Sequence, residues 1–258
     1  MQGKIIDAHI HLDMYTKDEQ NQILTELEQE KITAVVSVSN HLASSIANLR
    51  LAEQYEKIYP AFGFHPEQEL PSEAELEELI QFIQQYKDQA IAIGEVGLPY
   101  YMRQKAVNIN IEPYLELLEV FIKLSKQWDK PISLHAVYED ADLVCDLLEK
   151  HSIDKAHFHW FKGSYQTIER MIQNDYFISI TPDICYEKEI QQLVKGYPLT
   201  HIMVETDGPW PFTGPFANQL TSPVMIHDTI IKIAQIKKQS IANVYKQIFT
   251  TTKQFFAL

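Results

Sequence analysis

The chain has 258 residues, of which 45% are hydrophobic and only 8 are glycine, so it can build a large core and has little that resembles a linker. Its formal net charge of -13 argues against a broad basic surface that would hold nucleic acid through many phosphate contacts, although a local phosphate site is compatible with it. Cys145 and Cys185 are too far apart to suggest a disulfide framework or a thiolate zinc motif, and both are expected to be buried thiols.

Apolar runs alternate with amphipathic segments along the chain. The expected strands cover residues 4–10, 33–39, 58–64, 90–95, 131–135, 156–160, 176–180 and 201–205. The expected helices cover residues 17–31, 42–57, 72–86, 113–128, 140–150, 165–173 and 187–194, and a loop over 207–223 leads to two C-terminal helices. Ser72 and Glu75 match a capping box. No apolar run has the length of a signal core or a membrane span, which predicts a cytoplasmic protein without a membrane partner.

Strands that alternate with helices predict parallel pairing, in either an open doubly wound sheet or a closed barrel. Eight such units favour the barrel, and no Gly-rich phosphate-binding turn follows the first strand, as it would in a dinucleotide-binding sheet. Barrels of about 250 residues commonly form one domain. The sequence therefore predicts an α/β fold, a single (β/α)8 TIM barrel over residues 1–258 with an extra C-terminal helix.

Histidines and carboxylates gather at the ends of the expected strands. His9 and His11 end the first strand two positions apart, so both point to one face and can share an ion, although a lone His-x-His pair is more often structural. Further candidates at the same strand ends are His65, Glu95, His135, His159 and Asp207. These ends meet at one mouth of a barrel. Burial of so many ionisable groups is unfavourable unless divalent ions compensate them, which predicts a metal site.

Other residues near this mouth allow two interpretations each. His65 either contacts substrate or supports a metal ligand, unless it is only a packed loop histidine. His157 shares the face of His159 but is expected to be a hydrogen-bonded histidine of the barrel interior. Four aromatic residues near the mouth either stack on bases or merely pack the loops, namely Tyr100, Tyr101, Trp160 and Trp210.

Six stretches of the chain together resemble the TatD-like deoxyribonucleases and metal-dependent hydrolases, in order and in spacing. They are Asp7-Ala8-His9-Ile10-His11-Leu12, Gly63-Phe64-His65-Pro66, Ile93-Gly94-Glu95-Val96-Gly97-Leu98, His135, His159-Trp160-Phe161-Lys162-Gly163 and Glu205-Thr206-Asp207-Gly208-Pro209. Each motif is weak, but the set is highly specific. The resemblance covers residue 5 to about residue 210, and the last fifth of the chain matches poorly.

This resemblance implies a catalytic centre with two divalent metal ions. The implied roles are one ion on His9 and His11, a second on His135 and His159, a bridge between them at Glu95, and a metal-bound carboxylate beside the attacking water at Asp207. Nitrogen and oxygen ligands without thiolates suit Zn, Mn, Ni, Fe or Mg. The resulting hypothesis is a DNase-like hydrolase of small-molecule or nucleic-acid phosphoesters, with a 3′ exonuclease on single strands as one form.

The sequence also departs from the family pattern. Pro99 stands where the family usually has an aspartate, no arginine closely follows His135, and residues 213–223 replace an Arg- and Asn-rich stretch. Phosphate contacts are thereby fewer, so hydrolysis is better supported than nucleic acid as the substrate. Two alternatives stay open: an amidohydrolase-type enzyme that cleaves an amide, ester or lactone at the same site, and a non-catalytic metal-binding module in which Asp207→Asn would change nothing.

Overall fold

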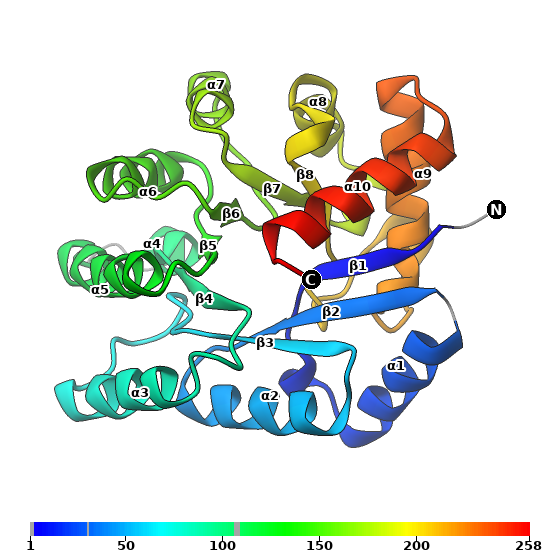
Figure 1. Cartoon of the computed structure of the whole chain (residues 1–258). Coiled ribbons are helices and arrows are strands. Elements are labelled where there is room, and N and C mark those ends of the chain that lie inside the picture. The colour runs from blue at the N-terminus through cyan, green and yellow to red at the C-terminus, as the bar shows by residue number, and fades with distance from the viewer. Residues whose placement is uncertain (1–2, 30, 106–108) are drawn as a thin grey trace.

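A computed structural model describes residues 3–29, 31–105 and 109–258. Within these residues, eight parallel strands follow one another around one sheet in sequence order. They are β1 Ile5–Ile10, β2 Ile32–Val38, β3 Ile58–Phe62, β4 Ala92–Gly97, β5 Ile132–His135, β6 Ala156–Phe158, β7 Phe177–Ile180 and β8 Ile202–Val204. Figure 1 shows helices in a ring around these strands. The strands are almost wholly buried, as their continuous apolar runs predict for a parallel sheet covered by helices. The predicted TIM barrel is confirmed.

The ring of helices follows the predicted alternation. The α-helices described are α1 Lys17–Gln29, α2 Leu42–Gln54, α3 Glu73–Gln85, α4 Tyr100–Lys105, α5 Glu112–Trp128, α6 Glu139–Lys150, α7 Tyr165–Gln173, α8 Lys188–Gly196, α9 Ile226–Lys237 and α10 Ile241–Phe255. Short 3-10 helices are η1 Leu12–Met14, η2 Pro182–Cys185, η3 Leu199–His201, η4 Gly214–Phe216 and η5 Pro223–Met225. The capping box of Ser72 and Glu75 at α3 is present. Glu30, inside the helix expected over 17–31, lies outside the described residues.

Three expectations about local structure were wrong. The stretch after Leu98 was expected to be irregular, but it contains α4, a helix of six residues. The fourth strand was expected over 90–95, whereas β4 begins at Ala92 and ends at Gly97. It begins later than expected because the Ala90 N–H still bonds to the Tyr86 carbonyl at the end of α3. Cys145 is buried as expected, but Cys185 is only partly buried, because it ends the 3-10 turn η2 outside the barrel interior.

Glycine allows β4 to run close beside β5 where the site begins. Gly97 pairs with His135, and a Cβ at this position would lie 2.0 Å from the His135 carbonyl oxygen. Its backbone φ of 159° is also an angle that residues other than glycine rarely adopt. Glycine is therefore required for the two strands to deliver Glu95 and His135 to the same end of the barrel.

Polar contacts join the first strand to the segment after the last one. The buried carboxylate of Asp7 accepts hydrogen bonds from the Thr206 backbone N–H at 3.1 Å and from the Thr206 hydroxyl at 2.5 Å. The backbone N–H of Asp207 donates to the His9 carbonyl at 2.9 Å. Burial raises the pKa of Asp7 to about 7, although the bonds from Thr206 oppose the shift. These bonds place Asp207 next to the histidines of β1.

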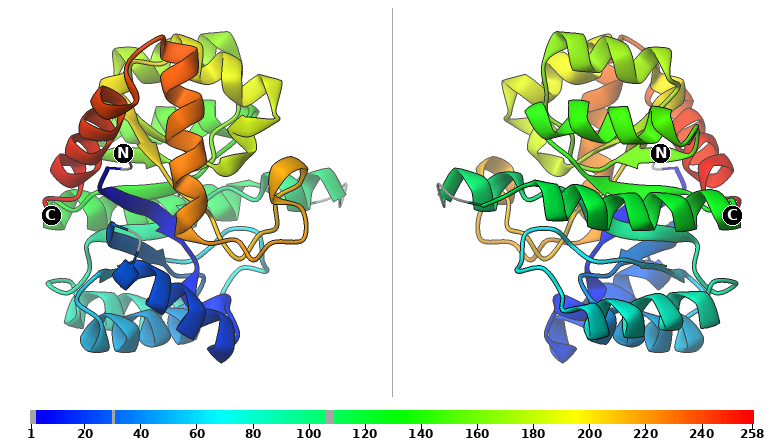
Figure 2. Two further views of the ribbon diagram at one scale, coloured as in Figure 1. Left: turned by 90° about the vertical axis from the view of Figure 1, so that its right-hand side faces the viewer. Right: turned by 90° about the vertical axis from the view of Figure 1, so that its left-hand side faces the viewer.

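The two ends of the barrel differ. In Figure 2, α4 and the loop before α9 project at one end, while the chain terminus after α10 lies at the other. There, Phe255 and Phe256 pack on a buried cluster from the strands, which consists of Ala8, Val36, Val38, Ala61, Ala92 and Met203. The site lies at the opposite end. In the described ranges, no helix combines the length and apolar character needed to cross a membrane.

Candidate metal centre

A cavity of about 660 Å³ opens at the carboxyl ends of the strands. All but one of the residues predicted to form the site line this cavity, namely His11, His65, Glu95, His135, His159 and Asp207. The remaining one, His9, is fully buried and contacts Glu95. The structure therefore brings together residues that β1, the loop after β3, β4, β5, the segment after β6 and the segment after β8 supply. Their assignment as ligands remains a prediction.

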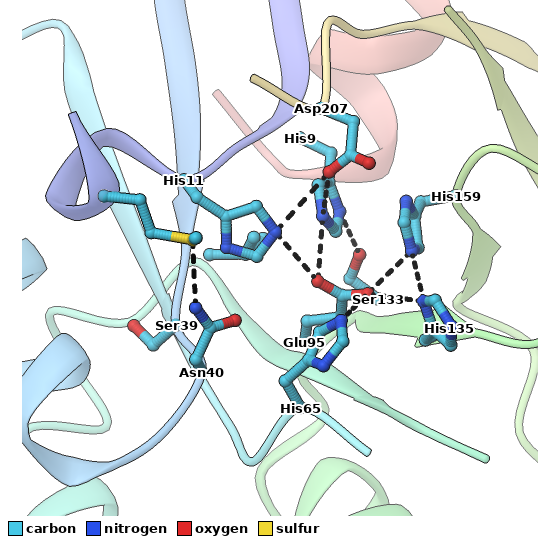
Figure 3. A network of polar contacts seen from close by, with 12 residues as sticks. His9, His11, Ser39, Asn40, His65, Glu95, Ser133, His135, His159 and Asp207 are labelled. Carbon is cyan, nitrogen blue, oxygen red and sulfur yellow. Dashed lines mark hydrogen bonds and ion pairs between the residues drawn. The ribbon is translucent and has the colours of Figure 1, made fainter. Parts of the chain in front are cut away.

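One oxygen of the Glu95 carboxylate faces His9 of β1 and His11, which directly follows this strand. Glu95 Oε2 lies 3.1 Å from the Nε2 atom of His9 and 3.1 Å from the Nε2 atom of His11. Asp207 joins this group, because its Oδ1 atom lies 3.4 Å from each of the same two nitrogens. Figure 3 shows Glu95 between these residues and the histidines on its other side.

The other oxygen of Glu95 faces three different histidines. Glu95 Oε1 lies 2.7 Å from His159 Nε2, 3.0 Å from His135 Nδ1 and 3.3 Å from His65 Nε2. His135 Nδ1 and His159 Nε2 are themselves 3.1 Å apart. The carboxylate thus divides the histidines into two groups, one at each oxygen. His65 lies in direct contact with Glu95 and is more than a packed loop residue.

The electrostatics of the centre follow from burial and from its carboxylates. Burial alone would raise the pKa of Glu95, but the surrounding histidines, His159 foremost, hold it well below its usual value. Burial lowers the pKa of His9 to about 4. Burial also acts to lower the pKa values of His11 and His135, but bonds to carboxylates outweigh it. These bonds raise the two pKa values to about 10 and about 9.

The chemistry of this donor set fits divalent metal ions. Two atoms that each lie about 2.1 Å from one ion are separated by about 3.0 to 3.4 Å at octahedral or tetrahedral angles. Four of the contacts around Glu95, at 3.0 to 3.3 Å, have this spacing, and the contact to His159 Nε2 is shorter, at 2.7 Å. Among the described residues, Asp207 Oδ1 is buried and has no hydrogen-bond partner. A buried carboxylate oxygen without a donor is unfavourable, and a cation would compensate it.

A buried chain of hydrogen bonds runs beneath the histidines. His9 Nδ1 lies 3.2 Å from Ser133 Oγ, which lies 3.3 Å from His157 Nδ1. His157 Nε2 lies 2.5 Å from Ser179 Oγ, which donates to Glu205 Oε2 at 2.5 Å. His157 is thus the hydrogen-bonded interior histidine that the sequence predicted. The chain also fixes the ring of His9 with its Nε2 atom toward Glu95.

The aromatic residues of the mouth divide into two kinds. Tyr101 and Trp210 line the cavity and are 42% and 48% exposed, so their rings are free to meet a ligand. Tyr100 packs on Tyr138, with ring centroids 5.0 Å apart. Trp160 also lines the cavity, but its Nε1 donates to Asp183 Oδ2 at 2.7 Å. Only the first two residues keep the stacking interpretation open.

Sequence reasoning missed three polar residues that touch the centre. Ser133 and Glu205 lie in the buried chain described above, and Glu67 contacts His135 Nε2 at 3.3 Å. Ser133 shares the strand face of His135, two positions away, which is a signal that alternation could have supplied. Glu67 follows His65 by two residues in a loop, where no such periodicity applies.

Comparison with protein-family models matches residues 6–257 to the TatD related DNase family. The chain belongs to this family. The resemblance in sequence motifs is thereby confirmed, but its expected end near residue 210 was wrong, because the TatD match continues through α9 and α10. The final helices lack polar motifs that reach the mouth, so their similarity to the family was not apparent from the motifs.

Individual TatD relatives support the same assignment. The chain is 39% identical to a metal-dependent hydrolase of Haemophilus influenzae named as uncharacterized, over 98% of this chain and 100% of the relative. It is 30% identical to human deoxyribonuclease TATDN3, over 93% of this chain and 90% of the relative. The crystal structure of the TatD homologue YjjV from Escherichia coli has the same fold, with a TM-score of 0.86, 24% identity and 98% coverage of both chains. The chain is a metal-dependent hydrolase of the TatD family.

The raised pKa values make metal binding by this TatD protein dependent on pH. At pH 7 the metal-free rings of His11 and His135 carry an extra proton, because their pKa values of about 10 and about 9 lie above this pH. A ligand nitrogen must lose its proton to bind an ion. We therefore expect proton release on metal binding at pH 7. The release should decline as the pH rises through about 9 and about 10, and metal affinity should rise over the same interval. Isothermal titration calorimetry in buffers of different ionisation enthalpy measures this release, and equal heats in all buffers at pH 7 would contradict it.

Proposed function

We propose that this protein hydrolyses phosphoester bonds with two divalent metal ions bridged by Glu95. The observation that carries the proposal is the division of ligands between the two oxygens of this one carboxylate. A bridging carboxylate needs each oxygen to face a separate set of donors, and this arrangement supplies both sets. We further propose that residues 1–258 act as one hydrolase domain, since one barrel uses elements from Ile5 to Phe255.

The proposed ligand sets combine these contacts with the roles that the family resemblance implies. The first ion would be held by His9 and His11 together with Glu95 Oε2, and the second by His135 and His159 together with Glu95 Oε1. Asp207 would complete the first set. The donors are imidazole nitrogens and carboxylate oxygens, which suit Zn, Mn, Ni or Fe and, less completely, Mg.

The chain supplies the proton acceptor for hydrolysis. When bound, divalent ions at such a centre make a water molecule more acidic and offset negative charge on the attacking and leaving oxygens of a phosphodiester. Asp207 Oδ1 is buried, borders the cavity and has no hydrogen-bond donor among the described residues. With Oδ1 on the ion, the other oxygen of the Asp207 carboxylate would be the one placed to take a proton from water. His65 would support the proposed bridge, because its Nε2 atom faces Glu95 Oε1 at 3.3 Å and its Nδ1 atom accepts the Glu67 backbone N–H at 3.1 Å.

The mouth favours a single strand or a small phosphoester over duplex DNA. Lys105 is the one lysine or arginine that lines the cavity within residues 3–29, 31–105 and 109–258, so few phosphates can be neutralised there. Tyr101 and Trp210 instead offer exposed rings on which a base can stack. The name deoxyribonuclease of the human relative agrees with a nucleic-acid substrate. We propose a DNase-like activity, with attack at the 3′ end of a single strand.

The test is an activity screen on protein stripped of metal and reloaded with one ion at a time. The substrates are a labelled single-stranded oligonucleotide, its duplex, a model phosphodiester, and a panel of amides and lactones. We expect metal-stimulated cleavage of the single strand and of the phosphodiester. His135→Ala should lose this activity, whereas His151→Ala should keep it, because His151 pairs with Glu119 on the barrel exterior.

Each other outcome identifies an alternative. Turnover of amides or lactones without phosphodiester cleavage would establish an amidohydrolase-type enzyme and overturn the proposal. Metal binding without any turnover across the panel would favour a non-catalytic module. Cleavage that does not depend on added metal would contradict the proposed centre altogether.

A further inference from the structure

Glu67 connects the metal centre to a helix of the mouth. This residue lies in the loop after β3, and its side chain is 14% exposed. Its Oε1 atom lies 3.3 Å from His135 Nε2 and accepts the Tyr101 backbone N–H at 2.7 Å. Its Oε2 atom accepts the Met102 backbone N–H at 2.6 Å. One carboxylate therefore contacts both a proposed metal ligand and the first turn of α4.

The ring of His135 needs a partner of this kind to serve as a ligand. Its Nδ1 atom faces Glu95 and His159, so the lone pair for an ion must be on Nδ1. In a neutral imidazole the proton then resides on Nε2, and its hydrogen bond determines the tautomer. Nε2 points to Glu67, which as a carboxylate can only accept. Glu67 thus selects the tautomer that leaves Nδ1 available.

Helix α4 depends on contacts from outside itself. It has six residues, and an isolated helix of this length is not stable in water. The N–H groups of Tyr101 and Met102 belong to its first turn, which lacks intrahelical acceptors. Glu67 satisfies both. Nearer its other end, Arg103 forms an ion pair with the buried Asp140 in the first turn of α6.

The same helix shapes the cavity. Tyr101 and Met102 line it, and the ring of Tyr101 lies 6.1 Å from the ring of His135 between centroids. We propose that Glu67 is a positioning residue that fixes the metal-binding tautomer of His135 and holds α4 in place, so that metal binding and the order of this helix depend on one carboxylate. The proposal rests on the proposed metal centre.

The test compares Glu67→Gln with Glu69→Gln, the same chemical change at an exposed position of the same loop. A glutamine can donate to Nε2 and so favours the tautomer with the proton on Nδ1, which blocks the ligand nitrogen. We expect Zn²⁺ binding, measured by competition with a chelator, to weaken about 10- to 100-fold in Glu67→Gln. Amide hydrogen exchange of Tyr101 and Met102 should become faster. The ¹⁵N shifts of the His135 ring, recorded above pH 10 so that the metal-free ring is neutral, should report the change of tautomer.

The control variant should match the parent in all three measurements. Unchanged Zn²⁺ affinity in Glu67→Gln would overturn the proposal, and so would faster exchange in α4 without weaker binding, because Glu67 would then only cap the helix. Weaker binding with unchanged exchange would refute the link to α4. If the parent protein itself bound no Zn²⁺, the proposed metal centre would be refuted. If parent and variant bound Zn²⁺ equally well, only the role of Glu67 would be refuted.

Discussion

Replacing Glu95 by glutamine is expected to lower metal-stimulated hydrolysis by at least about a thousand-fold, since divalent ions contribute several kcal/mol of charge stabilisation and each 1.4 kcal/mol is about tenfold in rate. Both oxygens of Glu95 contact ring nitrogens, and the carboxylate is fully buried. Glutamine has nearly the same shape but carries no charge and only one oxygen, so it cannot bridge two ions. The measurements are metal content per chain and the initial rate on a model phosphodiester.

A matched control separates this effect from a general loss of charge. Glu78→Gln makes the same change at an exposed position of α3, away from the cavity, and should leave metal content and rate unaltered. Retention of two ions and near-parental activity in Glu95→Gln would show that the carboxylate does not bridge, and the proposed centre would have to be abandoned.

Replacing Asp207 by asparagine is expected to reduce the rate about 10²- to 10⁴-fold, the usual contribution of a general base, while most of the bound metal remains. The amide oxygen of asparagine can still approach an ion, but an amide cannot accept a proton from water at neutral pH. Asp207 Oδ1 is buried at the cavity, 3.4 Å from the Nε2 atoms of His9 and His11, and Asp207 also groups with His9 and His159 as a set that could hold an ion. Because the asparagine oxygen keeps this position, the substitution should affect proton transfer more than ion binding.

Rate and metal content must be measured on the same preparation, with Asp18→Asn on the exposed face of α1 as the control. Full activity in Asp207→Asn would remove Asp207 as the proposed proton acceptor. Loss of both ions would instead assign Asp207 a purely structural role as a ligand.

The convergence of the site was predictable because strand geometry is regular. His9 lies in β1 and His11 directly follows this strand, so the two-residue period of a strand predicts their common face. Parallel strands of a barrel place their carboxyl ends at one mouth. The same rules located Glu95 and His135 without knowledge of any side-chain contact. Even the interior role of His157 followed from its position one layer deeper than His159.

Loop geometry has no such period, and this limited the prediction elsewhere. The path of the chain after His65 decides whether Glu67 points to solvent or to His135, and two residues of sequence do not specify it. Helix α4 escaped notice because six residues after Pro99 give little helical periodicity, and its first turn is stabilised by a carboxylate 34 residues away in the chain. The family usually has a carboxylate at position 99, directly before α4, and proline stands there in this chain. The carboxylate that contacts α4 is instead that of Glu67, from a neighbouring loop.

Phe255 and Phe256 cover the end of the barrel opposite the proposed metal centre, and the strand residues on which they pack are fully buried. Among the described residues, the barrel interior is thus closed at this end. If the protein hydrolyses a nucleic-acid strand as proposed, the strand must approach the centre from the mouth, and the released fragment must leave on the same side.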